Sequence, residues 1–199
     1  MAENNNGNWP NPTAISLFLV GAVIIGGFYP LQAGFVSFDA LPIIGFFLIA
    51  SSLVWLTLMV VCLKNGDFLG AAIHGVLGVL FGLAPGVGFV AEFIAKCYGV
   101  AVDGRINGWY LFYTGWAFFV LAWCGGKLLW HLTVTFLCVW IIAEITGLVT
   151  MGAISHHWLG VSKWLLLYAG IWFLYTGSAF TLNHVFQKKV LPLGGPLFK

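Results

Sequence analysis

The sequence predicts an all-α polytopic membrane protein, built as a bundle of six transmembrane helices. Two observations carry this prediction. First, 61% of the 199 residues are hydrophobic and 7% are charged, with a mean hydropathy of +0.99, whereas about 25% of the residues of a soluble domain are charged. Second, the apolar residues fall in six long stretches, and a run of about 18 or more apolar residues is typical of a helix that crosses a bilayer.

The six stretches follow one another with short connections. They cover residues 14–29, 42–63, 70–91, 108–124, 128–154 and 162–186. No connection is long enough for a separate soluble domain, so we expect one transmembrane domain over residues 14–186, between a polar N-terminal tail (1–13) and a C-terminal tail (187–199). The N-terminal tail lacks the positive segment that opens a cleavable signal peptide. So small a chain suits a narrow pore through each protomer, with the protomers closed into a ring.

The third stretch is rich in glycine. Gly78, Gly82 and Gly86 form two consecutive G-x-x-x-G steps, a spacing that lets helix backbones touch in lipid. We therefore expect this helix to lie at the centre of the bundle, in close contact with a neighbour, and to be kinked at Pro85. Residues 87–98 either extend this helix or lie at the membrane interface.

The distribution of lysine and arginine predicts the orientation, because cytoplasmic loops carry an excess of these residues. With six spans, both termini lie on one side of the membrane. That side carries Lys64, Lys127, Lys188, Lys189 and Lys199, and the other side carries Lys96, Arg105 and Lys163. The count favours a protein of the cell (inner) membrane with both termini in the cytoplasm.

Several classes of function are disfavoured by the sequence. The four cysteines form no C-x-x-C pair, and no pair of metal ligands at i and i+4, no Ser/His/Asp set and no glycine-rich phosphate loop is visible. The formal charge of +2 is spread thinly, without the basic cluster typical of nucleic-acid binding. We therefore expect neither an enzyme nor a cofactor or metal site.

Short motifs in a fixed order resemble one known family. Asn11-Pro12 precedes the first span, and Gln32-Ala33-Gly34-Phe35 follows it. The fourth span opens with Gly108-Trp109-Tyr110-Leu111, and Leu182-Asn183 leads to Val190-Leu191-Pro192-Leu193-Gly194. In this order and with these spacings, the chain resembles the acetate uptake transporter family, also called the GPR/FUN/YaaH family. The resemblance extends over nearly the whole chain.

The resemblance implies a fold and a function. Members of the family have six transmembrane helices, assemble as hexamers, and pass acetate and related small monocarboxylates, sometimes succinate, through a pore in each protomer. They act as channels or as proton symporters. A hydrophobic constriction formed by helices one, three and five narrows the pore, and it falls here at Val20, Leu77 and either Phe136 or Leu137. The implied partners are a small carboxylate, protons, membrane lipid and further copies of the chain.

A pore for carboxylates must supply hydrogen-bonding groups in place of water. We expect these groups from polar side chains of the spans and the terminal motifs, namely Asn11, Ser16, His74, Thr133, Glu144 and Asn183. Helical phase supports this choice, because positions i, i+4 and i+7 share a face. Thr133 and Glu144 share the face of Leu137, Ser16 shares that of Val20, and His74 neighbours Leu77.

Glu144 is the charged residue of an otherwise apolar stretch, 128–154. An acid in such a stretch is costly and marks a functional site by default. Either it lines the pathway, where its protonated form would donate a hydrogen bond or carry a proton, or it is paired across helices to hold a subunit interface. His74 is either a proton relay or a histidine hydrogen-bonded to a neighbouring backbone.

Two other functions stay open at this point. One is a channel for another small solute such as urea. The other is a haem-binding membrane anchor, for which His74, His131 and His184 are the candidate ligands in the spans.

Overall fold

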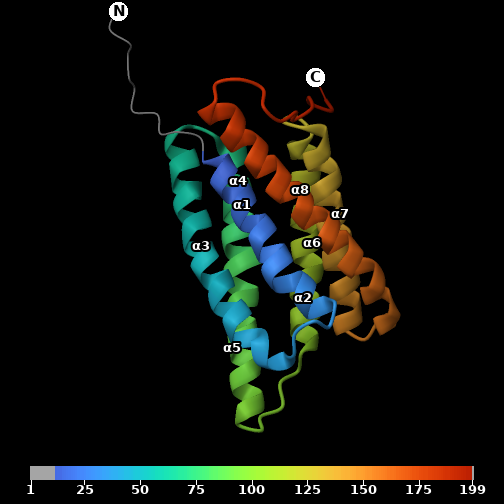
Figure 1. Cartoon of the computed structure of the whole chain (residues 1–199). Helices are drawn as coiled ribbons and strands as arrows, with labels where there is room; N and C mark the ends of the chain where they lie inside the picture. Colours follow the sequence, from blue (N-terminus) through green and yellow to red (C-terminus); the bar gives the residue numbers. More distant parts are fainter. Residues whose placement is uncertain (1–11, 199) are drawn as a thin grey trace, which may run out of the picture.

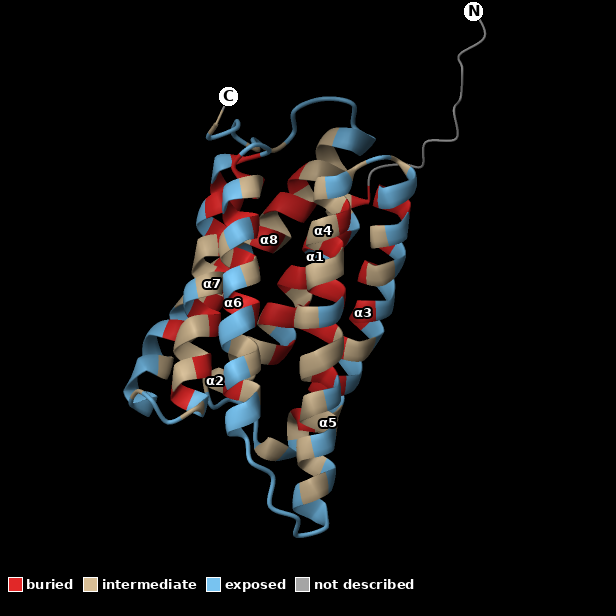
Figure 2. Cartoon of the chain, turned by 180° about the vertical axis from the view of Figure 1, so that it is seen from behind, coloured by how far each residue is buried: buried red, intermediate tan, exposed pale blue. Residues whose placement is uncertain are grey.

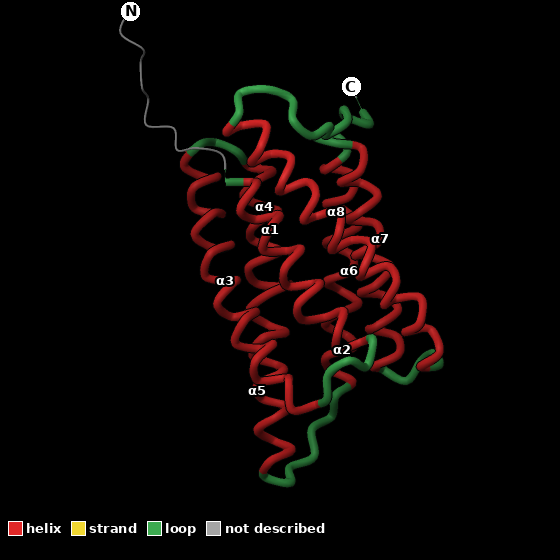
Figure 3. The backbone as a smooth tube through the Cα atoms, viewed as in Figure 1, coloured by secondary structure: helices red, strands yellow, loops and turns green. Residues whose placement is uncertain are grey.

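The computed structural model describes residues 12–198, and every regular element within that range is a helix (Figure 1). The long helices run side by side along a common axis, and the loops gather at the two ends of the bundle (Figure 3). α1 begins and α8 ends at the same end (Figure 1). We call this the terminal end of the bundle, and the opposite one the distal end.

The first half of the chain forms three spans. The first runs through α1 (Thr13–Val23), η1 (Ile24–Phe28) and α2 (Tyr29–Gln32). The second comprises η2 (Phe38–Ala40) and α3 (Leu41–Lys64), and the third comprises α4 (Phe68–Val76), η3 (Leu77–Leu83) and α5 (Ala84–Cys97). The third helix therefore continues to Cys97, which decides between the two alternatives that the sequence left open for residues 87–98.

The second half of the chain forms the other three spans. They are α6 (Arg105–Gly125), α7 (Trp130–Thr150) and α8 (Leu159–Val185), with the short η4 (His156–Trp158) before the last. The fifth span ends at Thr150, whereas the sequence predicts an end near residue 154. The chain turns earlier because Gly152 adopts a φ of 77°, in the left-handed region that favours glycine.

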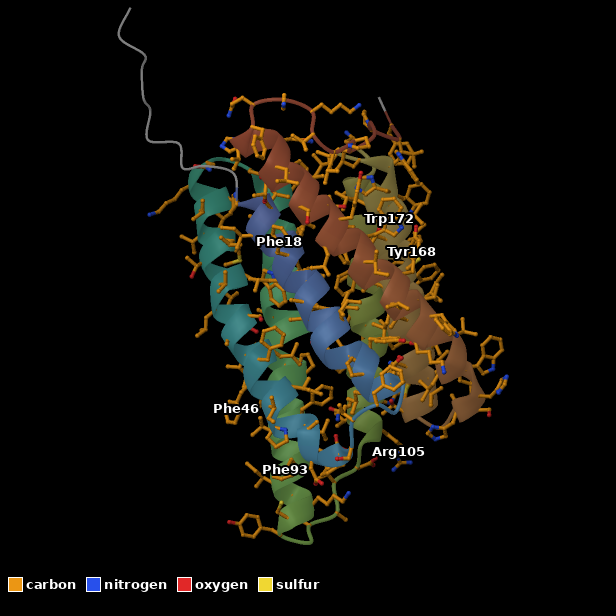
Figure 4. All side chains as sticks on the ribbon, viewed as in Figure 1. Phe18, Phe46, Phe93, Arg105, Tyr168 and Trp172 are labelled. Atoms are coloured by element: carbon orange, nitrogen blue, oxygen red, sulfur yellow. The ribbon has the colours of Figure 1, made fainter. Side chains whose placement is uncertain are left out.

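The prediction of an all-α membrane bundle is confirmed. In the described part of the chain, five helical stretches are long and apolar enough to cross a membrane: Thr13–Gln32, Phe38–Lys64, Phe68–Cys97, Trp130–Thr150 and His156–Val185. The remaining long helix, α6, has 21 residues, as α7 does, and packs along it. At 1.5 Å per residue it is about 32 Å long, enough to span a bilayer. On the outer surface, large apolar side chains such as Phe46, which is 62% exposed, point away from the bundle (Figure 4).

Glycines let two pairs of helices approach until their backbones touch. A Cβ atom on Gly86 of α5 would lie 2.8 Å from the carbonyl oxygen of Gly45 on α3. A Cβ atom on Gly147 of α7 would lie 2.8 Å from the carbonyl oxygen of Gly108 on α6. Gly82 also packs against α3, where a Cβ would meet the side chain of Ser52. The close contact predicted for the glycine-rich third helix is confirmed, and its partner is α3.

The two π-helical segments, η1 and η3, each lie directly before a helix with a proline in its first turn. These prolines are Pro30 in α2 and Pro85 in α5. Proline lacks an N–H, and its ring clashes with the carbonyl group four residues earlier in an α-helix. A wider turn at this point gives the ring room and keeps the helix continuous. The sequence predicts a kink at Pro85, and what the structure has there is the π-helical segment η3 directly before α5.

Buried residues follow the inward faces of the helices (Figure 2). They form one apolar cluster that contains a chain of aromatic rings. The ring centroids of Phe81 and Phe118 are 5.7 Å apart, those of Phe118 and Phe136 are 6.1 Å apart, and those of Phe136 and Phe173 are 5.6 Å apart. These separations are typical of favourable aromatic pairs. The rings therefore join η3, α6, α7 and α8 across the bundle.

Residues 190–198, which we call the C-terminal strap, fold back over the terminal end. Asn183 holds its start, since its Nδ2 donates to the carbonyl of Leu191 (2.8 Å) and its Oδ1 accepts from the N–H groups of Val190 and Leu191 (2.7 and 2.9 Å). Farther along, the N–H of Leu197 donates to the carbonyl of Gly126, between α6 and α7 (2.7 Å). The N–H of Trp130, the first residue of α7, donates to the carbonyl of Gly195 (2.9 Å), so the strap is tied to each of the last three spans.

Candidate permeation pathway

A cavity of about 550 Å³ lies in the distal half of the bundle. Its wall comes from the end of the first span, the second half of the third, the start of α6 and the end of α7, with Leu166 of α8. Most of the wall is apolar. Its polar side chains are those of Gln32, Glu92, Asn107, Tyr110, Thr114, Thr146 and Thr150. Glu92 also lines a second pocket, shared with Lys96 at the distal end of α5.

A closed ring of hydrogen bonds joins three helices beside the cavity. Gln32 Nε2 donates to Thr146 Oγ1 (3.0 Å), and Ser162 Oγ donates to Gln32 Oε1 (2.8 Å). The two hydroxyl oxygens lie 3.3 Å apart. Since the Ser162 proton is directed to Gln32, the Thr146 hydroxyl donates to Ser162 and completes the ring. One amide hydrogen of Gln32 is left over, and its side chain lines the cavity. An amide N–H is a hydrogen-bond donor suited to a carboxylate or carbonyl oxygen.

Tyr110 adds a second polar element to the wall. Its hydroxyl donates a short hydrogen bond to the carbonyl oxygen of Leu80, and both residues line the cavity. Leu80 lies within the π-helical segment η3, where the regular i to i+4 bonding is interrupted. The tyrosine therefore satisfies a backbone oxygen and fixes α6 against η3 at the cavity.

Toward the terminal end, the cavity wall includes Ile24, Phe81 and Phe118. The proposed constriction begins one helical turn beyond these residues. Val20 lies four residues before Ile24 and Leu77 four residues before Phe81, so each continues the face that lines the cavity. Both side chains are 1% exposed and belong to the apolar cluster. A dry layer therefore follows the cavity along the axis of the bundle.

On α7, the structure distinguishes the two candidate constriction residues. Phe136 lies three residues before the cavity-lining Val139, is 1% exposed, and contacts the rings of Phe118 and Phe173. Leu137 is only partly buried and packs against the outside of the apolar cluster. We therefore propose that Val20, Leu77 and Phe136 form the dry layer, since the alternative residue, Leu137, packs against the buried cluster from outside.

Polar side chains lie beyond the dry layer. Ser16 is four residues before Val20, and His74 is three residues before Leu77. Both side chains are 2% exposed. In residues 12–198, the buried side-chain polar atoms without a hydrogen-bond partner are Ser16 Oγ, His74 Nε2 and Thr133 Oγ1. All three belong to the residues that the sequence places along a pathway, and buried polar groups without partners are rare enough to call for an explanation.

Glu144 does not line the cavity, and the predicted direction of its helix face is corrected. The cavity is lined by Ile142 and Thr146 of α7, each two residues from Glu144. Two residues correspond to about 200° around an α-helix, which places Glu144 on the opposite face. There its Oε1 accepts a hydrogen bond from Trp140 Nε1 (3.1 Å) and lies against Gly115, where a Cβ would be 2.7 Å from the same oxygen. The acid therefore packs against α6.

The remaining predicted residues occupy different surroundings. Thr133 lies beside Gly126, where a Cβ would be 2.7 Å from Thr133 Oγ1, so it faces the end of α6 and not the cavity. The amide of Asn183 holds the C-terminal strap, which uses its Oδ1 and one hydrogen of Nδ2. Asn11 lies outside the described residues.

Some cavity residues escaped the sequence reasoning. Gln32 and Tyr110 belong to the motifs of the family that the chain resembles, and neither they nor Thr146 and Ser162 are among the predicted site residues. Thr146 and Thr150 are spaced at i and i+4 in an apolar stretch, and this spacing indicates a polar helix face. For Ser162 no local signal exists, because its partner Gln32 lies 130 residues away in the sequence.

Comparison of the sequence with protein-family models and with curated proteins finds no match. The fold, in contrast, is similar to a solved structure, that of the bacterial acetate channel SatP. The superposition has a TM-score of 0.75 and covers 94% of this chain and 99% of that chain, at 18% sequence identity. The bundle fold expected from the resemblance to the acetate uptake transporter family is therefore the fold that this chain has.

Proposed function

We propose that this chain forms a membrane channel, or a proton-coupled transporter, for acetate and related small monocarboxylates, extending to succinate, through a pore in each protomer. The observation that carries the proposal is the order of groups along the bundle axis. A cavity with amide and hydroxyl groups comes first, the dry layer of Val20, Leu77 and Phe136 follows, and buried polar atoms lie beyond it. The similarity in fold to a bacterial acetate channel supports the same conclusion.

The dry layer favours the uncharged form of the permeating acid. Moving an ion from water into a protein interior costs several kcal/mol per ion, even after the protein relaxes. Burying a neutral polar group without a partner costs about 1–3 kcal/mol on the protein scale. A protonated acid therefore crosses Val20, Leu77 and Phe136 more easily than its anion, and a proton crosses with it. Vesicles with and without an imposed pH gradient test this inference, because a pathway for the neutral acid accumulates acetate on the alkaline side, whereas a pathway for the anion alone does not.

We also propose that the protein is a homo-oligomer, a hexamer as in the family that it resembles, with both termini in the cytoplasm of the cell membrane. The excess of lysine at the terminal end supports this orientation. Cys97, at the distal end of α5, is exposed. A membrane-impermeant thiol reagent added to intact cells should label it, and labelling only after lysis would reverse the orientation. The mass of the detergent-solubilised particle gives the number of subunits.

The transport proposal is tested by uptake of labelled acetate into vesicles that contain the purified protein. Gly88 lines the cavity, and the nearest atom to a Cβ built on it is Asn107 Oδ1 at 3.9 Å. Gly88→Leu should therefore fill part of the cavity without disturbing the helices and lower uptake several-fold. Gly26→Leu is the matched control, because this glycine is exposed and has nothing within 4 Å of its Cβ. Wild-type uptake equal to that of empty vesicles would refute the proposal.

A channel for a neutral solute such as urea is the second candidate, because the cavity wall carries neutral amides, those of Gln32 and Asn107. Uptake of labelled urea in the same vesicles separates the two. A haem-binding anchor has less support. His131 Nε2 already lies 3.1 Å from Thr176 Oγ1, and His74 Nδ1 lies 2.5 Å from the carbonyl of Gly70. A Soret band in the purified protein would restore that candidate.

A further inference from the structure

The hydrogen bonding of His74 determines which of its ring nitrogens carries the hydrogen. Nδ1 lies 2.5 Å from the carbonyl oxygen of Gly70, one turn earlier in α4. A carbonyl oxygen only accepts, so Nδ1 is the donor. In a neutral imidazole the other nitrogen then has a free lone pair. Nε2 of His74 is therefore a hydrogen-bond acceptor and a base.

This nitrogen is buried and unused. The His74 side chain is 2% exposed, and Nε2 has no hydrogen-bond partner within the described range of the chain. Burying an acceptor without a partner is unfavourable, and the fold nevertheless retains it. A buried lone pair without a partner is suited to a ligand that carries a hydrogen-bond donor.

The position of His74 relative to the dry layer indicates what that occupant is. The residue lies three positions before Leu77, on the terminal side of the layer. On the first span, Ser16 lies four positions before Val20, also on the terminal side, and its Oγ is likewise buried without a partner. A neutral carboxylic acid that leaves the dry layer carries an O–H group that needs an acceptor and a carbonyl oxygen that needs a donor. An imidazole nitrogen and a hydroxyl group supply these two functions.

We propose that His74 Nε2 accepts the acid proton of the permeating carboxylic acid on the terminal side of the dry layer. In this step the O–H bond of the acid breaks and an N–H bond forms at Nε2, which leaves a carboxylate and an imidazolium. The imidazolium keeps its Nδ1–H bond to Gly70. It then releases the Nε2 proton to water at the terminal end, which restores the neutral ring. The inference rests on the proposed function and names the group that would separate the proton from the anion.

The surroundings of the ring fit this chemistry. Asp67 caps α4 and accepts a hydrogen bond from the N–H of Gly70 (2.8 Å), so its negative charge lies close to the imidazolium and stabilises it. The other titratable group beside the ring is the thiol of Cys62 on α3, whose Sγ is 3.6 Å from Nδ1. Lys64, at the end of α3, is exposed to solvent.

The proposal is tested by ¹⁵N NMR of histidine-labelled protein in lipid vesicles, near neutral and at weakly acidic pH. The His74→Asn variant identifies the signals, because an Asn amide takes the place of Nδ1 toward Gly70 and leaves nothing at Nε2. We expect Nε2 of His74 to be unprotonated in the wild type without substrate and to shift toward the protonated value when acetate is added. His157→Asn, in the exposed short helix η4 at the distal end, serves as the control. A protonated Nε2 without substrate, or no shift with acetate, would overturn the proposal.

Transport provides the second readout. His74→Gln places an amide near the Nε2 position, which forms hydrogen bonds but does not take up a proton. We expect this variant to lower the acetate uptake measured at weakly acidic pH by roughly a hundredfold, the lower end of the range for proton transfer by a positioned group. If the wild type takes up acetate and His74→Gln takes it up equally fast, the inference is refuted and the channel function stands. No wild-type uptake at all would refute the channel function itself.

Discussion

The contact between α3 and α5 at Gly45 and Gly86 makes a quantitative prediction. In Gly86→Ala, the added Cβ would lie 2.8 Å from the Gly45 carbonyl oxygen and 2.9 Å from Ile49 Cγ1, so the two helices must move apart. Overpacking of this kind costs about 1–3 kcal/mol. Gly88→Ala, two residues away on α5, meets only Asn107 Oδ1 at 3.9 Å. Both variants gain about 0.5–1 kcal/mol from replacing glycine in a helix, so that term cancels in the comparison.

Thermal unfolding in detergent measures the difference between the two variants. A thiol-reactive fluorophore reports unfolding as the increase in labelling when the buried Cys62 becomes exposed, above the signal of Cys97, which is already exposed in the folded protein. At about 2–4 °C per kcal/mol for a chain of this size, we expect Gly86→Ala to unfold roughly 2–12 °C below Gly88→Ala, and Gly88→Ala to equal or exceed the wild type. Equal midpoints for the two variants would show that the backbones of α3 and α5 do not touch at this point.

Three further predictions concern residues outside the dry layer. Because Glu144 faces α6, Glu144→Gln should keep the bond from Trp140 and leave the pH profile of acetate uptake unchanged; an altered profile would return Glu144 to the pathway. Asn183→Leu removes three hydrogen bonds to the C-terminal strap, about 0.5–1.5 kcal/mol each, and should speed hydrogen exchange at its first amides; unchanged exchange would show that Asn183 does not hold the strap. Side-chain hydrogen bonds from Arg105 lower the pKa of Asp103 from 3.8 to about 2. A lowered acid pKa adds stability that is present above pH 3.8 and is lost as the pH falls through about 2. Carboxyl NMR should find this midpoint near 2 in the wild type and higher in Arg105→Gln, which loses the side-chain bonds and keeps the bond from the backbone N–H of residue 105. Equal midpoints would contradict it.

Hydrophobic length and small-residue spacing were sufficient to predict the bundle. The lengths of the apolar stretches predict the spans, and the spacing of Gly78, Gly82 and Gly86 predicts a close helix pair, because both effects depend on residues within one helix. The partner of that pair, α3, could not be predicted in this way. Its Gly45 carries no signal that distinguishes it from other glycines in the chain.

The candidate site was harder to predict, because helical phase gives relative and not absolute directions. Thr133, Leu137 and Glu144 do share one face of α7. Which neighbour that face meets depends on the rotation of the whole helix, which is set by contacts such as that of Glu144 with Gly115 on α6. The same rotation brings Phe136, and not Leu137, to the axis of the bundle. A single sequence does not contain the information for this rotation.

The π-helical segments have a consequence for how the pathway opens. A π-helical turn bonds residue i to i+5, about one residue more per turn than an α-helix. If Leu77–Leu83 tightened into α-helix, the register of α5 would advance by one residue relative to α4, a rotation of about 100°. Phe81 would then leave the cavity floor while every backbone group before and after the segment kept its bonding pattern. A switch to the α-helical register would also rotate Gly86 away from Gly45, so this movement would require α5 to leave its close contact with α3.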